Sequence, residues 1–313
     1  MKLVVNIPAY NEEEHLPIVL KQIPKKIAGI SAIEVQVIDD GSTDNTYAVA
    51  KKYGCRVIRQ KQNLGLGNAF KLGMETALEH GCDIFVNTDA DNQYPGKYIP
   101  SLIKPIMNNE ADIVIGNREP WNVAHFSYFK RIAQYFGNLI TRTIAGSDVP
   151  DTVSGFRAYS REALLRLNVM TRFSYVLDTI IQASKKGMKI VSIPIKVNEV
   201  KRKSRLFKSS FHHIRATSAN ILRLYAIYEP FKTFLVISMI FFIPAMLLTT
   251  RFLVFYFDGS PGGHIQSLIA AAILYLLGGL MFVLGVIADL IGINRRLNEE
   301  QSYLQKKEYY GRK

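Results

Sequence analysis

The stretch Ile-Phe-Val-Asn-Thr-Asp-Ala-Asp-Asn-Gln at residues 84–93 carries an apolar run straight into a pair of carboxylates. The apolar residues predict a buried strand over residues 83–87. Side chains two positions apart on a strand share a face, so Asp89 and Asp91 are predicted to converge on one cation. Carboxylate oxygens suit Mg²⁺ or Mn²⁺, and such an ion neutralises a diphosphate leaving group. Acidic residues are common in turns, so the interpretation as a metal site depends on the apolar strand that precedes this pair.

Polar residues also come after two earlier apolar runs. Ile-Pro-Ala-Tyr-Asn-Glu at residues 7–12 closes the first run, and Val-Ile-Asp-Asp-Gly-Ser at residues 37–42 closes the second. Asp39 is placed to accept a hydrogen bond from the N–H of a nucleobase, and Tyr10 could line that base. The alternative is helix capping by Asn11 or Thr43 with a simple turn between.

Short apolar runs alternate with amphipathic stretches through the first two thirds of the chain. Strands are predicted at residues 3–8, 34–39, 56–59, 83–87 and 113–116, and helices at 12–23, 43–53 and 68–80. This alternation predicts an α/β fold with a mostly parallel sheet and helices on both faces. Ligands of such sheets bind at the carboxyl ends of the strands, where the polar residues gather here.

Length and composition fit one enzyme domain with an appendage. The chain has 313 residues, of which 48% are hydrophobic and 21% charged, so wholesale disorder is excluded. Its two cysteines have no metal-ligand spacing and are expected to be idle thiols in a reducing compartment. A net charge of +13 indicates an anionic partner, which could be nucleic acid, phospholipid or a phosphorylated substrate. The first residues do not form a signal peptide, so the first 200 residues are expected to stay where they are made.

The composition changes near residue 200. Residues 200–215 hold six basic side chains and no acid, and apolar residues over 211–228 recur at a helical spacing. An ordinary surface helix with a charged side is one interpretation. We favour a juxtamembrane amphipathic helix over residues 207–232, because two long apolar segments come directly after it.

These two apolar segments lie at about residues 234–257 and 266–293. Each has about the 20 residues needed to cross a bilayer, although two buried core helices would give a similar pattern. Basic residues lie before the first segment and in a basic tail over residues 294–313, while the turn between the segments has no Lys or Arg. This pattern predicts an integral membrane hairpin (residues 233–293) with both termini and the catalytic domain in the cytoplasm. Gly278, Gly279 and Gly285 are expected to mark close packing of the two helices.

Taken together, the three strand-end motifs resemble those of family 2 glycosyltransferases of the GT-A fold. Within that family the chain looks like the dolichyl-phosphate mannose and glucose synthases and their bacterial polyprenyl-phosphate relatives. The resemblance covers about residues 1–206, with Asp39, the cluster at residues 89–93 and the segment Asp-Thr-Val-Ser-Gly-Phe-Arg at residues 151–157 in order.

The resemblance implies roles for individual residues. The nucleotide is held by Pro8, Tyr10, Glu12 and Asp39, and the metal (Mg²⁺ or Mn²⁺) and diphosphate by Asp89, Asp91 and Gln93. Basic residues at places similar to Arg118, Arg131 and Arg202 bind the acceptor phosphate, and guanidinium groups fit phosphate oxygens. Asp178 falls where many relatives carry Glu, and it is expected to orient the sugar or metal. The basic run lacks the glycine that often precedes its Ser-Lys pair, which leaves closure of that loop over the donor open.

The implied function is inverting, metal-dependent transfer of a hexosyl group from a nucleotide-sugar to dolichyl or polyprenyl phosphate at a membrane. The donor could be GDP-mannose, UDP-glucose or a UDP-N-acetylhexosamine, since Asp39 can bond uracil or guanine equally well. The alternative is a membrane enzyme with a hydroxyl acceptor, in which Asp178 is the general base.

Three other interpretations fit less well. The glycines at residues 63–68 lack the third glycine of a dinucleotide fingerprint. Trp121, the one tryptophan, lies outside the Gln-x-x-Arg-Trp motif of processive synthases. A nucleic-acid binder would leave the carboxylates without a role, so no nucleic-acid partner is expected. The small residues of the hairpin also allow a homo-oligomer.

Overall fold

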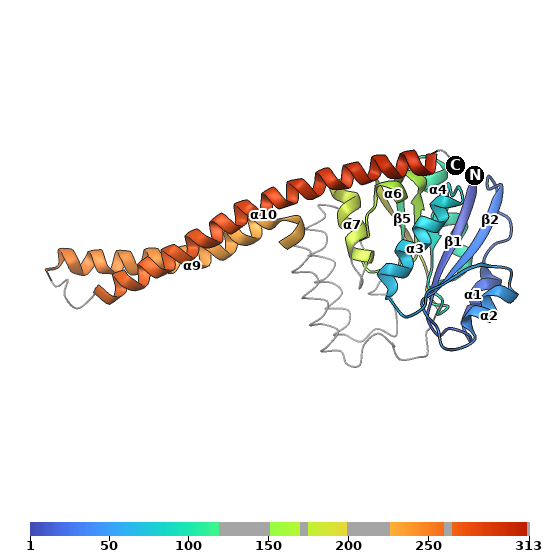
Figure 1. Ribbon diagram of the computed structural model, residues 1–313, viewed down its shortest axis with the longest axis horizontal. Coiled ribbons are helices and arrows are strands. Elements are labelled where there is room, and N and C mark those ends of the chain that lie inside the picture. Colours follow the sequence, from blue (N-terminus) through green and yellow to red (C-terminus); the bar gives the residue numbers. More distant parts are fainter. Residues whose placement is uncertain (119–150, 170–174, 199–225, 260–264, 312–313) are drawn as a thin grey trace. The chain divides into compact units, whose positions relative to one another are not determined.

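The computed structural model describes residues 1–118, 151–169, 175–198, 226–259 and 265–311. The chain divides into two compact units. One comprises residues 1–216 together with 299–313, and the other comprises residues 217–298. The first unit is built on a sheet, and the second is a pair of helices (Figure 1).

The sheet of the first unit has seven strands in the order β3-β2-β1-β4-β6-β5-β7. They are β1 (Lys2–Ala9), β2 (Ala32–Asp39), β3 (Arg56–Arg59), β4 (Ile84–Asn87), β5 (Ile113–Asn117), β6 (Arg157–Ser160) and β7 (Ile190–Pro194). Only β6 runs antiparallel to its neighbours β4 and β5, and the other pairs are parallel. The predicted mostly parallel sheet is therefore confirmed.

Helices cover both faces of the sheet. They are α1 (Leu16–Gln22), α2 (Thr46–Lys52), α3 (Leu66–Glu79), α4 (Ile99–Met107), α6 (Arg161–Arg166) and α7 (Tyr175–Lys185), with a short 3-10 turn η1 (Gly96–Tyr98) before α4. Residues of α1 and α4, such as Leu16 and Leu102, share a core with Val5 and Ile7 of β1. Strand β1 is buried along nearly its whole length because it is covered on both sides, which explains its continuous apolar run.

Two predicted helices begin later in the structure than expected. Helix α1 begins at Leu16 and not at residue 12, and α2 begins at Thr46 and not at residue 43. The residues before α1 turn away from the helical path, since Asn11 has a φ of 55°. The two loops before these helices bond to each other at the carboxyl end of the sheet.

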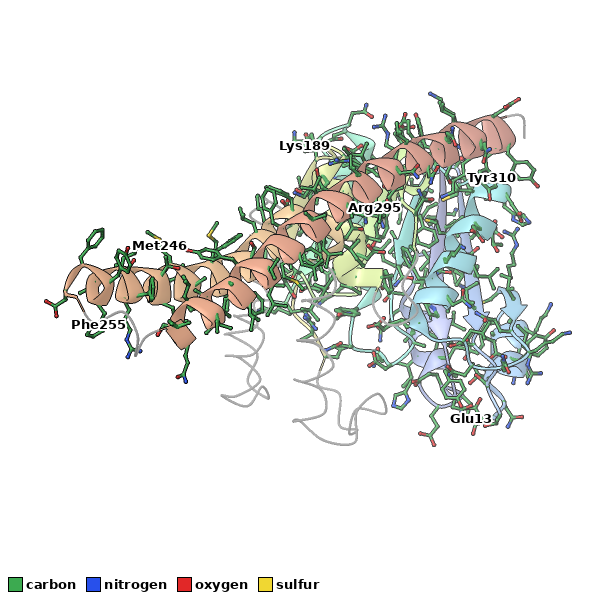
Figure 2. The ribbon with its side chains drawn as sticks, turned by 60° about the vertical axis from the view of Figure 1, so that its left-hand side comes forward. Glu13, Lys189, Met246, Phe255, Arg295 and Tyr310 are labelled. Atoms are coloured by element: carbon green, nitrogen blue, oxygen red, sulfur yellow. The ribbon has the colours of Figure 1, made fainter. Side chains whose placement is uncertain are left out.

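The second unit is a hairpin of α9 (Pro230–Phe257) and the first part of α10 (Ile265–Gly311). In the most apolar stretch of each helix only 11% and 17% of the residues are buried, so most of these apolar residues are not covered by the rest of the described chain. Apolar side chains such as Met246 project from α9 (Figure 2). Both helices are long and apolar enough to cross a membrane.

Close contacts join the two helices of the hairpin. The Ser238 hydroxyl donates to the carbonyl of Gly278 at 2.8 Å, and a Cβ at Gly285 would lie 2.9 Å from the Cβ of Phe234. The predicted close packing is thus confirmed at Gly278 and Gly285, whereas Gly279 has open space within 4 Å of a Cβ. Helix α10 continues to Gly311, through the segment predicted from the sequence to be a basic tail.

Candidate active site

The loops after β1 and β2 are bonded to each other at the carboxyl edge of the sheet. The backbone N–H of Asn11 donates to the Ser42 hydroxyl at 3.0 Å, and that of Glu12 donates to the Thr46 hydroxyl at 2.8 Å. In return the Asn11 side chain accepts the N–H of Thr43 at 2.8 Å. These bonds hold two predicted nucleotide-binding segments side by side.

Asp39 lies fully buried at the end of β2. One of its carboxylate oxygens accepts the N–H of Ser42 at 2.9 Å, and the other lies 3.2 Å from the Nε of Arg59 on β3. The same guanidinium donates to the Ser42 carbonyl at 3.0 Å. Arg59 is a neighbour that sequence reasoning missed, because nothing local to either residue indicates that β2 and β3 place them together.

The next residue, Asp40, fixes the loop that opens α3. Its carboxylate accepts the N–H groups of Leu64 and Gly65 at 2.8 and 2.9 Å. Burial raises the pKa of Asp40 and outweighs these two bonds, which lower it. Gly41 has a φ of 75°, and a Cβ there would come within 2.5 Å of the Gln62 backbone, so only glycine fits this close approach.

Asp89 and Asp91 lie beyond the end of β4, in the loop after Asn87. The two carboxylates are therefore brought together by a turn, and not by the shared strand face that their spacing predicted. Asn92, directly after this turn, has a φ of 63°, and its side-chain oxygen accepts from Gln22 at 2.9 Å. The N–H of Gln93 donates to the Asp91 carboxylate at 3.0 Å.

The carboxyl group of Asp89 lies in a crowded acidic environment. Its pKa is raised to about 7, first by burial and then by the charges of Asp91 and Glu12, while Arg118 acts in the opposite direction. Gly155 approaches it so closely that an added Cβ would lie 3.1 and 3.2 Å from its two oxygens. Glu12, Asp89 and Asp91 therefore share one negative region at the edge of the sheet.

This region fits a divalent cation that is completed by a substrate. In the part of the chain that the structure describes, no group of three or more His, Cys, Asp or Glu side chains has the arrangement of a metal cage. Mg²⁺ is commonly bound by one or two carboxylates, with phosphate oxygens and water as its other ligands. Asp89 and Asp91 match that pattern, and a cation would also relieve the repulsion that raises the pKa of Asp89.

Arg118 comes directly after β5 and forms a two-pronged ion pair with Asp151. Its Nε and Nη2 donate to the two carboxylate oxygens at 2.8 and 2.9 Å, and its backbone N–H donates at 3.1 Å. Burial opposes ionisation of Asp151, but the guanidinium holds its pKa below the usual value. The predicted acceptor-binding arginine is thus fixed in place near Asp89 by a residue from the 151–157 segment.

A chain of buried amides crosses the sheet toward the same region. The Gln36 amide donates to Asn6 at 2.8 Å, Asn6 donates to Asn87 at 2.8 Å, and Asn87 donates to the Tyr175 hydroxyl at 2.8 Å. Asn87 also reaches the carbonyl of Gly155 at 3.2 Å. Buried polar groups are costly unless paired, so this chain fixes Gly155 relative to β4. Sequence reasoning missed these residues, although polar residues inside apolar strands were the available signal.

A second buried network ties residues 152–154 to α7. The guanidinium of Arg157, which is fully buried, donates to the carbonyls of Ser154, Thr152 and Val176 at 2.8, 3.0 and 2.7 Å. It also donates to the Thr179 hydroxyl at 3.0 Å. Arg157 therefore ties the loop next to Asp89 to α7.

Asp178 lies in the first turn of α7 and is 3% exposed. Tyr175, the first residue of α7, stacks on Phe70 of α3 with ring centroids 3.9 Å apart. Of the other predicted residues, Pro8 is buried on β1, whereas Tyr10 is 40% exposed and open to a ligand. Arg131 and Arg202 lie outside the described residues.

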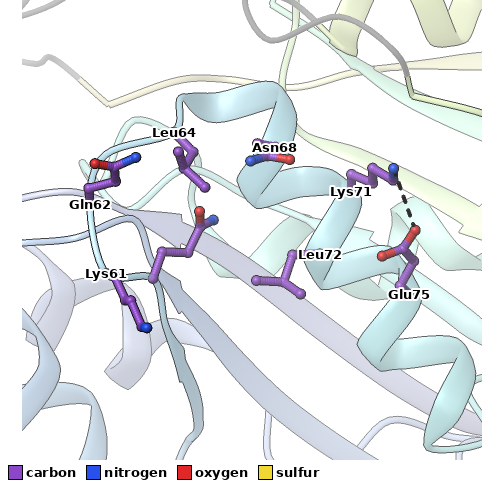
Figure 3. A pocket seen from close by; sticks show the side chains of 8 residues that line it. Lys61, Gln62, Leu64, Asn68, Lys71, Leu72 and Glu75 are labelled. Carbon is purple, nitrogen blue, oxygen red and sulfur yellow. Dashed lines mark ion pairs between the residues drawn. The ribbon is translucent and has the colours of Figure 1, made fainter.

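A hollow of about 650 Å³ lies between α3 and the segment after β3, next to the loop that Asp40 holds (Figure 3). Its lining includes Gln60, Lys61 and the ion pair Lys71–Glu75, with 3.9 Å between charged atoms. None of the predicted site residues lines it. The predicted metal- and phosphate-binding residues therefore gather at the carboxyl edge of the sheet and not in the lining of this hollow.

Comparison with known proteins agrees with this geometry. A family model described as "Glycosyl transferase family 2" matches residues 4–167, just over half of the chain. A UDP-N-acetylglucosamine–dolichyl-phosphate N-acetylglucosaminyltransferase of Methanococcus voltae is 31% identical over 212 residues, which cover 61% of this chain and 83% of that protein. The dolichol-phosphate mannosyltransferase of Pyrococcus furiosus is 33% identical over 204 residues, covering 62% of this chain and 56% of that protein.

A solved structure shares the fold at lower sequence identity. Glucosyl-3-phosphoglycerate synthase from Mycobacterium tuberculosis, in complex with Mn²⁺, UDP and phosphoglyceric acid, is 22% identical with a TM-score of 0.56. The match covers 72% of this chain and 77% of that one. At this level of identity the likeness shows the common fold of the two catalytic domains.

Proposed function

Because the chain belongs to glycosyl transferase family 2 and is a glycosyltransferase, we propose that it moves a hexosyl group from a nucleotide-sugar to dolichyl or polyprenyl phosphate. The observation that carries the proposal is the pair of carboxylates, Asp89 and Asp91, in the loop directly after β4 at the carboxyl edge of the sheet. It lies beside the paired β1 and β2 loops, in a chain that also has two helices able to cross a membrane. Relatives named for transfer to dolichyl phosphate support the acceptor class.

The donor is proposed to lie along the ends of β1, β2 and β4. Pro8, Tyr10, Glu12 and Asp39 would hold the nucleotide. Asp89, Asp91 and Gln93 would hold Mg²⁺ or Mn²⁺, which supplies positive charge to the diphosphate when it is bound. Both guanine and uracil fit a carboxylate that accepts a base N–H, so GDP- and UDP-sugars are both candidate donors.

The reaction is proposed to be a single displacement. An oxygen of the lipid phosphate forms a bond to the anomeric carbon while the bond to the nucleoside diphosphate breaks, and the bonding electrons leave with the diphosphate. One displacement inverts the anomeric centre. Arg118, oriented by Asp151, would bind the acceptor phosphate together with Arg131 and Arg202. A phosphate is already anionic near neutral pH, so Asp178 is not needed as a base and would orient the sugar.

A hydroxyl acceptor is the second candidate. The observation that favours it is the burial of Asp178 on α7, because a carboxyl group shielded from water is suited to work as a general base. In that case Asp178→Asn would abolish transfer. With a phosphate acceptor, the same variant would retain measurable transfer.

The chain is further proposed to cross the membrane twice, with the catalytic unit and the end of α10 on the cytoplasmic side. Residues 299–313 group with the catalytic unit, so both ends of the hairpin return to the same side. The turn between the helices has no Lys or Arg, which is typical of a non-cytoplasmic loop.

The proposal is tested by supplying the purified protein in detergent with polyprenyl phosphate and a panel of labelled GDP- and UDP-sugars, with Mn²⁺ or with a chelator. We expect labelled lipid from one donor, in the presence of the metal only. Donor hydrolysis or transfer to a soluble hydroxyl, without labelled lipid, would overturn the phosphate acceptor.

The metal site is tested with Asp91→Ala. We expect loss of transfer and weaker Mn²⁺ binding by electron paramagnetic resonance, because one of two carboxylate ligands is removed. Glu79→Ala removes an exposed carboxylate of α3 and is the matched control, with transfer and Mn²⁺ binding unchanged. Normal Mn²⁺ binding by Asp91→Ala would contradict the assignment.

A further inference from the structure

We propose that the last turns of α10, residues 299–310, work as a strap that binds the catalytic unit and holds α7 in position for sugar transfer. The strap lies on a docking face made of Glu162, Arg166, Leu167, Asn168 and Lys186. The part of this inference that concerns transfer rests on the proposed function. The docking itself does not.

The strap contacts the docking face along one side of the helix. Its contacting residues are Glu299, Ser302, Tyr303, Lys306 and Tyr310. The last four follow Glu299 by three, four, seven and eleven residues. That spacing places them on one helical face. Three of them, Glu299, Tyr303 and Tyr310, are each 8% exposed, whereas Leu304 on the other side is 56% exposed. This segment is therefore an amphipathic helix seated on protein and not a solvated tail.

Tyr303 forms the centre of the strap. Its hydroxyl donates to the Glu162 carboxylate at 2.8 Å, and its ring lies under the Arg166 guanidinium at 4.9 Å. Glu162 and Arg166 are themselves paired at 2.6 Å on α6. One side chain of α10 thus contacts both members of an ion pair on the catalytic unit, Glu162 by a hydrogen bond and Arg166 through its ring.

Lys306 anchors the strap to the residues after α6. Its ammonium group donates to the Leu167 carbonyl at 2.8 Å and to the Asn168 side chain at 2.7 Å, and the Ser302 hydroxyl lies 3.3 Å from the same Asn168 oxygen. Burial lowers the pKa of Lys306 to about 8. A lysine placed to attract lipid phosphate would instead be solvated and exposed.

Both ends of the strap are fixed by charged groups. Glu299 pairs with Lys186 at 2.9 Å. At the other end, Arg161 donates to the carbonyl of Tyr310 at 3.0 Å and to that of Cys82 at 2.9 Å. The last carbonyls of a helix have no partner within the helix, so an arginine here satisfies one of them and ties the helix end to the sheet.

The docking face continues into the site through α7. The backbone of Asn168 and the side chain of Gln182 bond to each other twice, at 2.9 and 2.6 Å. Gln182 lies one turn after Asp178, and the same helix supplies the carbonyl of Val176 that Arg157 binds. A strap that fixes Asn168 therefore fixes α7, and α7 positions both Asp178 and the loop next to Asp89.

A comparison of variants at two neighbouring lysines distinguishes docking of the strap from simple attraction of α10 to anionic lipid. Lys306→Met and Lys307→Met each remove one positive charge from the same turn. Lys307 is exposed, and it contacts Tyr303 of its own helix, at 3.4 Å from the hydroxyl and 5.6 Å from the ring centroid, whereas Lys306 bonds to Leu167 and Asn168. The full-length variants are compared in detergent and in anionic-lipid nanodiscs. The measurements are kcat, the KM for donor and for lipid acceptor, and amide hydrogen exchange over residues 175–185.

We expect Lys306→Met to speed exchange in α7 and to lower kcat about tenfold, with the donor KM within about twofold of the parent. Lys307→Met should match the parent in the exchange rate of α7 and in kcat. Equal losses in the two variants, seen only with anionic lipid, would overturn the strap and leave lipid attraction as the role of both charges.

Two tyrosine variants test the docking of the strap without a change of charge. Tyr303→Ala removes the buried ring, and Tyr309→Ala removes a ring that is 55% exposed on the same helix. Faster exchange in α7 for Tyr303→Ala alone supports the strap, and unchanged exchange in both overturns it. If no variant or parent transfers sugar to lipid, the proposed function fails while the exchange data still decide the docking.

Discussion

Gly155 determines how closely the 151–157 segment approaches Asp89. A Cβ at this position would lie 3.1 Å from a carboxylate oxygen of Asp89 and 3.4 Å from the Tyr175 hydroxyl. Either the carboxylate or the loop must move to make room for a methyl group. The residue therefore acts on the proposed metal site through its lack of a side chain.

We predict that Gly155→Ala weakens Mn²⁺ binding about tenfold and lowers transfer, because it displaces Asp89. The measurement is Mn²⁺ titration by electron paramagnetic resonance, together with the donor assay. Gly279→Ala is the control, since a Cβ there meets nothing within 4 Å. Unaltered Mn²⁺ affinity in Gly155→Ala would show that Asp89 does not depend on this contact.

The sequence indicated a role for Arg118 but not its partner in the fold. Its charge and its place after a strand indicated an anion-binding role. In the structure its guanidinium is already held by both oxygens of Asp151, 33 residues away. The acceptor role stays a prediction, and an incoming phosphate would share an arginine that is pre-oriented.

At the scale of elements, the hairpin is held by small residues on α10. Gly285 and Gly278 face Phe234 and Phe242 of α9, and the Cβ clearances of 2.9 and 3.2 Å leave no room for a larger side chain. Close approach of the backbones strengthens van der Waals packing, which is the main attraction between helices in lipid.

We predict that Gly285→Ile destabilises the hairpin by about 1–3 kcal/mol, because the branched side chain forces the helices apart. Thermal unfolding in detergent should show a lower midpoint for this variant. Gly279→Ile places the same side chain in open space and should leave the midpoint near that of the parent. A similar loss in both variants would indicate an effect on helix propensity and not on packing.

At the scale of the whole molecule, the two native cysteines make the proposed topology easy to test. Burial raises the pKa of Cys55 to about 11 and that of Cys82 to about 12, so neither forms a reactive thiolate at neutral pH. An introduced cysteine on the surface would therefore be the reactive thiol among the described residues.

We predict that Asp258→Cys, at the end of α9, reacts with a membrane-impermeant maleimide in intact cells. Gln305→Cys, on the exposed side of the strap, should react only after the membrane is permeabilised. The parent protein is the control and should remain unlabelled. Labelling of both variants in intact cells would contradict two crossings with a cytoplasmic catalytic unit.

The sequence by itself determined the order and type of the main elements. The predicted strand at residues 56–59 coincides with β3, and the one at 113–116 differs from β5 by a single residue. The two long apolar helices were also evident. Hydrophobic periodicity and run length are local properties, so a single sequence is sufficient to read them.

Only the tertiary structure decided which distant residues meet. The antiparallel β6, the bond from Asn87 to Tyr175 across 88 positions, and the contact of Lys306 with Leu167 across 139 positions have no local signature. The position of Asp89 and Asp91 in a turn after the end of β4 was likewise decided by the tertiary structure. Such pairings depend on how strands and helices pack, because hydrogen bonds and ion pairs form between groups that the fold, and not the chain order, places together.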